Sequence, residues 1–263
     1  MRLGTWGQLV GIVFVGLLVI GEAHAHDVWI MIMPDGAATL RAVVHHGHPG
    51  DPKTPDPDKL FEFIMQGSRQ PTQSLLAGVT VTLQDGIPVL MTNPLTPPNE
   101  ASLTILAARY DNGYWVKMPF GHRNTSKRQV RDGEESLYSM KFAKALLQKS
   151  SEITNAYQQN IGHRLELIPV SNPFASKPGD DLMIQVDFDG KPLPDSDVES
   201  GDGITPRDEK DIPRFRTDKQ GIAVIPITRR GPHLFVVDHL EASIHPDLAS
   251  QELYNATLSF VLP

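Results

Sequence analysis

Residues that interrupt helices occur along the whole length of this chain. Its 263 residues include 22 prolines and 21 glycines, scattered rather than gathered in one segment. Proline cannot donate a backbone hydrogen bond, and glycine loses much conformational freedom when it enters a helix. A proline or glycine that interrupts helices occurs roughly every 8–15 residues, which leaves room for short strands but not for long helices. We therefore predict an all-β protein of two β-sandwich domains with few or no long helices.

Short runs of alternating apolar and polar residues locate the expected strands. Two of these runs, residues 101–110 and 113–118, flank Asp111-Asn112-Gly113, which is a strong signal for a hairpin turn. Residues 137–147 fit either a strand or one face of a helix, and we favour a strand because the chain is β-rich. Residues 195–211 are acidic and are expected to form a solvated loop. The other predicted strands are residues 27–33, 39–46, 78–83, 165–170, 181–188, 191–198, 223–226 and 233–239.

The first 25 residues have the three parts of a cleavable secretory signal peptide. Arg2 supplies a positive charge, residues 9–20 are apolar, and Ala23-His24-Ala25 matches the A-x-A cleavage pattern. A transmembrane anchor is the alternative, but a helix needs about 20 apolar residues to cross a bilayer. We expect export to the periplasm by the general route, without a stable membrane anchor. The predicted domains are then residues 26–164, which carry a metal-binding N-terminus, and residues 165–263.

Charge, cysteine content and missing motifs argue against several classes of function. The chain has a formal net charge of -7 and contains no cysteine. An acidic chain is a poor candidate for nucleic acid, because phosphate binding rests on a basic surface. Without cysteine there is no thiolate metal site, iron–sulfur cluster or cysteine catalysis. The sequence also lacks the G-x-S-x-G, H-E-x-x-H and phosphate-binding glycine motifs, so we do not expect an enzyme.

Histidines gather around the expected N-terminus of the mature chain. Cleavage after Ala25 would give His26 a free α-amine close to its imidazole, and the two groups can chelate one metal ion. If the first two strands pair as a hairpin, His26 lies near His45, His46 and His48. In a strand His46 and His48 share one face whereas His45 points to the other, so we favour the first two as ligands.

The sequence leaves alternatives open at this site. Cleavage after Ala23 would place His26 third in the chain, an arrangement that binds Cu(II) or Ni(II) through the amine, two amides and the imidazole. The rival interpretation is an ordinary polar loop at the end of a strand, with a disordered N-terminus beside it. His239 lies near a strand end beside Asp238 and Glu241, and we add it as a further candidate ligand.

Two later motifs bear on the fold of the second domain. Residues 189–193 read DGKPL and residues 217–221 read TDKQG, with glycines where turns need a positive φ. Together they resemble the turn pattern of transthyretin-like and bacterial immunoglobulin-like modules. This resemblance implies an immunoglobulin- or transthyretin-like β-sandwich over residues 165–263.

A further set of motifs lies along the mature chain at residues 25–30, 47–48, 110–117, 139–147, 162–169, 188–193, 217–221 and 237–240. Their order is similar to that of a bacterial family of periplasmic proteins, long labelled a domain of unknown function and associated with nickel and cobalt uptake. The resemblance implies a substrate-binding or accessory protein that holds a transition-metal ion outside the cytoplasmic membrane, with a metal transporter of the inner membrane as partner. The family's pattern implies that His26 is the first metal ligand and His48 the second. His45 and His46 are additions of this chain.

The leading hypothesis is a periplasmic metal-binding protein that uses His26 and the cluster of His45, His46 and His48. Nickel or cobalt is the favoured ion, with copper and zinc as alternatives. One rival is an exported interaction module whose histidines are incidental. A second, less favoured rival is a copper enzyme that oxidises a polymer, which usually needs a flat aromatic face. Only Trp29 and Trp115 remain to build such a face once the signal is removed.

Overall fold

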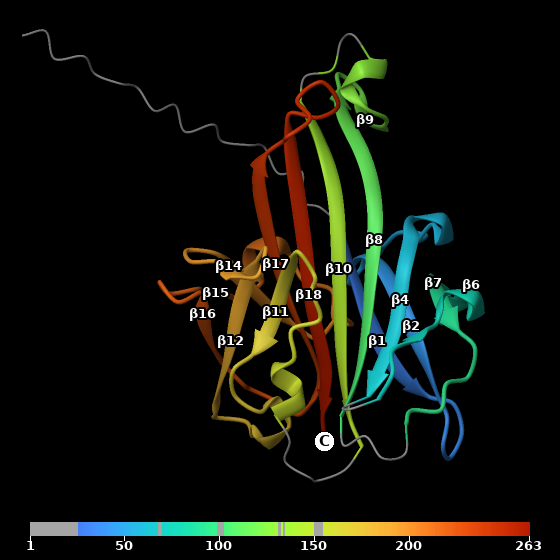
Figure 1. Ribbon diagram of the computed structural model, residues 1–263, viewed down its shortest axis with the longest axis vertical. Coiled ribbons are helices and arrows are strands. Elements are labelled where there is room, and N and C mark those ends of the chain that lie inside the picture. Colours follow the sequence, from blue (N-terminus) through green and yellow to red (C-terminus); the bar gives the residue numbers. More distant parts are fainter. Residues whose placement is uncertain (1–25, 68–69, 99–102, 131–132, 134, 150–154) are drawn as a thin grey trace, which may run out of the picture.

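The computed structural model describes residues 26–67, 70–98, 103–130, 133, 135–149 and 155–263. The predicted signal peptide, residues 1–25, lies outside the described residues. The described chain folds into three β-sheets packed as sandwiches (Figure 1). The all-β fold class predicted from the scattered breakers and alternating runs is thus confirmed.

We name the sheets A, B and C. Sheet A has the order β1-β2-β7-β6, with β3 beside β2: β1 (Asp27–Pro34), β2 (Leu40–His48), β3 (Asp51–Pro52), β6 (Val79–Gln84) and β7 (Ile87–Thr92). Sheet B has the order β15-β14-β17-β18-β10-β8-β4-β5, with β9 beside β8: β4 (Leu60–Gly67), β5 (Gln73–Ser74), β8 (Leu103–Met118), β9 (Gly121–Asn124), β10 (Ser136–Gln148), β14 (Asp197–Gly201), β15 (Arg214–Arg216), β17 (Gly231–Ala242) and β18 (Gln251–Leu262). In sheet C, β12 (Asp181–Phe188) pairs with β11 (Leu165–Pro169), β13 (Lys191–Pro192) and β16 (Ile222–Pro226).

Helical structure in the described ranges is limited to short 3-10 segments between strands. They are η1 (Pro57–Lys59), η2 (Leu76–Gly78), η3 (Lys127–Gln129), η4 (Asn155–Gln158), η5 (Pro173–Ala175) and η6 (Glu209–Asp211). None of these helical segments is long and apolar enough to span a membrane.

Sheet B is the middle layer, and sheets A and C cover different parts of its two faces (Figure 1). Side chains of sheet A and of β4, β8 and β10 form one core. Side chains of sheet C and of β10, β17 and β18 form a second core. Strand β10 serves both, because successive side chains of a strand point to opposite faces. Ala143 and Ala145 enter the first core, and Phe142 and Leu146 enter the second.

The middle layer runs through both predicted domains without a break. Strand β10, from the first half of the chain, pairs in parallel with β18 from the second half, in a register that aligns Leu137 with Gln251. Sheet B thereby joins strands from either side of residue 165. The division into domains at residues 164 and 165 stays a prediction.

The predicted hairpin at Asp111-Asn112-Gly113 is wrong. Strand β8 runs straight through these residues from Leu103 to Met118. Its pairing with β10 skips Asn112, because Gly113 aligns with Ser139 whereas Asp111 aligns with Met140. Gly113 has a φ of 78°, so the positive φ that suits a turn is used here in a β-bulge.

Most other strand predictions agree with the structure to within a few residues. Residues 137–147 form a strand, as favoured. The predicted strand 191–198 is instead split into β13 and β14 around Pro194 and Asp195, and Asp195 has a φ of 56°. The acidic stretch 195–211 contains β14 and is therefore only partly a loop. The sequence patterns do not predict strands β3, β4, β5, β7, β9, β15 and β18.

Candidate metal site

Antiparallel pairing of β1 with β2 brings the N-terminal histidines together. The register places Val28 opposite His46 and Asp27 opposite Gly47, which carries His26 to the level of His48. The centroid of the His26 ring lies 5.7 Å from that of His46 and 5.5 Å from that of His48. The strand-face argument from the sequence therefore correctly groups His46 and His48 beside His26.

Gly47 allows the chain to turn sharply between His46 and His48 of β2. Its φ is 111°, and a β-carbon at this position would lie 2.5 Å from the carbonyl oxygen of Asp51 and 2.8 Å from the amide nitrogen of Lys53. Because only glycine accepts both the positive φ and the close approach, this residue fixes the path that presents His48.

A polar network lies beneath the His48 ring. The Nδ1 atom of His48 lies 3.3 Å from Oδ2 of Asp27, and this hydrogen bond is the main cause that raises the pKa of His48. The Asn255 side-chain amide donates to Oδ1 of Asp27 and to Oδ1 of Asp238, each at 2.8 Å. Burial, together with the charge of Asp27, raises the pKa of Asp238 to about 7, although its side chain opens to the cleft described below. With Nδ1 held by Asp27, the Nε2 atom of His48 stays available for a ligand.

His26 and His46 are biased toward the neutral imidazole. Burial and the neighbouring His48 lower the pKa of His26. Burial, with a contribution from Lys141, lowers the pKa of His46 to about 3. The backbone of Thr54 lies close to the His46 ring and acts against this shift, yet neither ring nitrogen of His46 has a well-formed hydrogen bond within the described chain. A neutral imidazole is the form that binds a metal ion.

A buried lysine lies close to these histidines. Lys141 of β10 is fully buried, and its Nζ atom has no hydrogen-bond partner within the described residues. Its charge contributes to lowering the pKa of His26 and of His46, and burial lowers the pKa of Lys141 itself. The charge of Lys141 acts on any cation bound at the histidines, so Lys141 contributes to the electrostatic potential of the site.

His45 and His239 are not brought to this cluster. His45 lies on the other face of β2 and stacks on Trp29, with ring centroids 4.9 Å apart. His239 on β17 packs against Phe188, with centroids 4.3 Å apart. Since both rings contact aromatic side chains away from His26, the site proposed for His26 does not include them.

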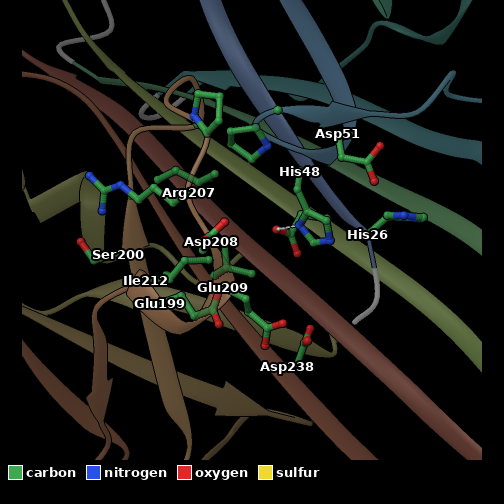
Figure 2. A pocket seen from close by; sticks show the side chains of 18 of the residues that line it. His26, His48, Asp51, Glu199, Ser200, Arg207, Asp208, Glu209, Ile212 and Asp238 are labelled. Carbon is green, nitrogen blue, oxygen red and sulfur yellow. Dashed lines mark ion pairs between the residues drawn. The ribbon is translucent and has the colours of Figure 1, made fainter. Parts of the chain in front are cut away.

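A cleft of about 820 Å³ opens beside the histidines. His26 and His48 lie at one side, and the segment that begins with β14 forms the other (Figure 2). Ser139 lines the cleft, and its buried Oγ atom has no partner within the described residues. Most charged side chains in the lining are carboxylates: Asp27, Asp51, Glu199, Asp202, Asp208, Glu209 and Asp238. An acidic cleft favours a cation in front of the histidines.

Sequence reasoning missed the network around these candidate ligands. Asp27 follows His26 directly, and a carboxylate next to a candidate ligand is a usable signal. Lys141 is a single charged residue on the face of β10 that also carries Ala143 and Ala145. A lone charge on an otherwise apolar strand face is a signal for a buried charged group. The contacts of Asn255 could not be found, because β18 itself was not predicted.

The side chains as placed do not amount to a preformed three-ligand site. Among the described residues no group of three or more histidine, aspartate or glutamate side chains is arranged so that it could hold a metal ion. A site made of two imidazoles and the α-amine of His26 needs only two side chains, because the main chain supplies the third donor. The donor types at this place therefore fit a transition metal only with the contribution of the mature N-terminus.

Comparisons with known proteins identify a family but no function. No curated protein matches the chain. A solved structure described as a chimeric titin Z1Z2 functionalized with a KLER exogenous peptide from decorin matches over 90% of this chain and 94% of its own, with 13% identity and a TM-score of 0.19. A structural similarity this low supports no conclusion about the fold or function of this chain. The model of the family described as "Domain of unknown function (DUF4198)" matches residues 23–241, which is most of the chain and includes His26, His46 and His48. The chain therefore belongs to the DUF4198 family, a domain of unknown function.

Proposed function

We propose that this protein is an exported, non-enzymatic binder of a divalent transition-metal ion. The ion is held by the α-amine and imidazole of His26 and by one further imidazole, that of His48 or of His46. The observation that carries the proposal is the placing of both rings within 5.7 Å of the His26 ring, centroid to centroid. Nickel or cobalt is the favoured ion, and copper and zinc are the alternatives.

The protonation states of the three histidines support the proposal. His26 and His46 have lowered pKa values, so both imidazoles present a lone pair near neutral pH. Asp27 accepts from Nδ1 of His48 and so directs Nε2 outward, as carboxylates commonly do behind metal-binding histidines. An amine with a reference pKa of about 7.7–8.0 gives up its proton readily to a metal ion. The set is nitrogen-rich, which suits nickel, cobalt and copper better than magnesium or calcium.

The open cleft suits loading and release of the ion. The histidines lie at the wall of a cleft of about 820 Å³ rather than inside a closed core, so the ion has a path to solvent. Carboxylates such as Asp51 and Glu199 attract cations toward that path. A role beside a metal transporter of the inner membrane follows only from the family resemblance and is part of the proposal.

Calorimetric titration with NiCl2 tests the site. The mature protein that begins at His26 is expected to bind one Ni(II) ion, and one extra alanine before His26 should weaken binding at least tenfold, because it removes the free amine next to the imidazole. His48→Ala should weaken binding by a similar factor. His122→Ala is the matched control, since this exposed histidine on β9 also lines the cleft. Equal affinity of the extended and the mature forms would refute the proposed site.

A further inference from the structure

A second cleft, of about 730 Å³, lies on the other face of sheet B from the histidines. Met140 and Phe142 of β10 line it, whereas Lys141, between them in the strand, points to the histidine side. The loops at residues 160–164, 189–190 and 244–245 complete its walls. Its volume lies within the range of small-molecule sites, about 300–1,000 Å³.

Aromatic rings form much of the lining of this cleft. Tyr114 and Tyr138 lie side by side on neighbouring strands, with centroids 5.0 Å apart. Phe61 is 48% exposed at the same cleft, and Tyr254 contributes a further ring. The face of an aromatic ring is apolar and carries a partial negative charge, so it attracts the apolar C–H face of a sugar ring.

The polar groups of the lining are held in fixed positions. The Arg164 guanidinium lies over the rings of Phe188 and Tyr254, with its central carbon 4.8 Å and 4.4 Å from their centroids. Its Nε atom donates to Oδ1 of Asp189 at 2.8 Å. The Arg109 side chain donates from Nη2 to the carbonyl oxygen of Gly162 at 2.9 Å. Fixed donors and acceptors lower the entropy lost when a ligand with several hydroxyl groups binds.

The charges of this lining balance. Two guanidiniums, of Arg109 and Arg164, stand against two carboxylates, of Asp189 and Glu252. His163 is neutral, because burial lowers its pKa to about 3, and its Nε2 atom is buried without a hydrogen-bond partner in the described chain. An ionic ligand gains little from such a lining, whereas a neutral polar ligand can use each group as a hydrogen-bond donor or acceptor.

We infer that this aromatic cleft binds a short, neutral oligosaccharide. The sugar rings stack on Tyr138 and Tyr114, and their hydroxyl groups bond to Arg109, Asp189 and Arg164. This inference is independent of the proposed metal site, which lies on the opposite face of β10.

A glycan array probed with the fluorescently labelled mature protein in EDTA tests the inference. We expect retention on neutral glycans that share one terminal unit, and EDTA keeps the result separate from metal binding. Titration of the best array ligand should then show at least tenfold weaker binding for Tyr138→Ala and a change of less than threefold for Tyr138→Phe, which keeps the ring.

Phe120→Ala is the matched control, because Phe120 is a fully exposed aromatic residue that does not line either cleft. It should bind as the unmodified protein does. The inference is overturned if no neutral glycan is retained, if peptides rich in aromatic residues bind in their place, or if Tyr138→Ala binds with unchanged affinity.

Discussion

Replacement of Glu166 by alanine is expected to lower the free energy of unfolding by about 3–5 kcal/mol. Glu166 and Lys144 form an ion pair of 2.6 Å, and their side chains are only 1% and 2% exposed. The same carboxylate accepts backbone hydrogen bonds from Ile161, Gly162 and His163. Without Glu166 the buried Lys144 would lose its ion-pair partner, and the amides of Ile161 and His163 would lose their acceptor. Urea unfolding at pH 7 measures the loss.

Two further variants separate this effect from a general loss of packing. Lys144→Met should cost less than Glu166→Ala, because the carboxylate that remains keeps its three backbone donors. Glu199→Ala removes a partly exposed carboxylate that pairs with Arg214 at 2.7 Å, and it should change the free energy by about 1 kcal/mol or less. A loss below about 1 kcal/mol for Glu166→Ala, or a larger loss for Lys144→Met, would contradict the account.

Acidification below pH 6.5 is expected to destabilise the protein through its buried histidines. Burial lowers the pKa of His45 to about 4 and that of His163 to about 3. The unfolded chain binds protons at these residues near pH 6.5, whereas the folded chain does not. Their contribution to stability is therefore complete above pH 6.5 and is lost as the pH falls toward 4 and 3. Each histidine contributes a slope of about 1.4 kcal/mol per pH unit in that interval.

The measurement compares slopes, because other groups also titrate in this range. Asp238 acts in the opposite direction, because its raised pKa lets the folded chain bind a proton before the unfolded chain does, and its exposure to the cleft keeps this effect small. His163→Gln should remove about 1.4 kcal/mol per pH unit from the slope of unfolding free energy between pH 6 and 4.5. The charged groups near His163 are Lys144, Arg109 and Glu166, which accepts from its backbone amide, and all three stay in place. His122→Gln is the control for an exposed histidine, and a slope that His163→Gln leaves unchanged would disprove the assignment.

The sequence predicts this fold well where strands are short and alternate clearly. Strand β1 and the adjacent β2 follow from apolar alternation and the turn at Pro34-Asp35-Gly36. The hairpin error at Gly113 arises because a β-bulge and a tight turn both need a positive φ, and local sequence does not distinguish them. Strand β18 was missed, although it lies between β10 and β17 in sheet B. Its pairing with β10 is set by contacts between distant parts of the chain, which local patterns do not record.

The candidate site likewise combines features set by local sequence with features set by contacts between distant parts of the chain. The grouping of His26 with His46 and His48 could be predicted, because it depends on strand faces and one hairpin. The hydrogen bonds that Asn255 makes to Asp27 and Asp238 could not, because they join the N-terminal strand to β18 through tertiary packing alone. Local patterns thus find side chains that neighbouring strands bring together and miss the groups that contact them from elsewhere in the fold.

The parallel pairing of β10 with β18 has a consequence for the order of folding. At the start of this pairing, Ser136 and Ser250 are in contact although 114 positions separate them in the chain. Until β18 is synthesised and docks, one side of β10 keeps a row of unpaired amide and carbonyl groups. Closing so long a loop is slow, so the two halves reach their native arrangement together and late. A polypeptide interrupted before residue 251 would therefore expose an unpaired, aggregation-prone strand edge on β10. A chaperone that covers β10 would assist folding.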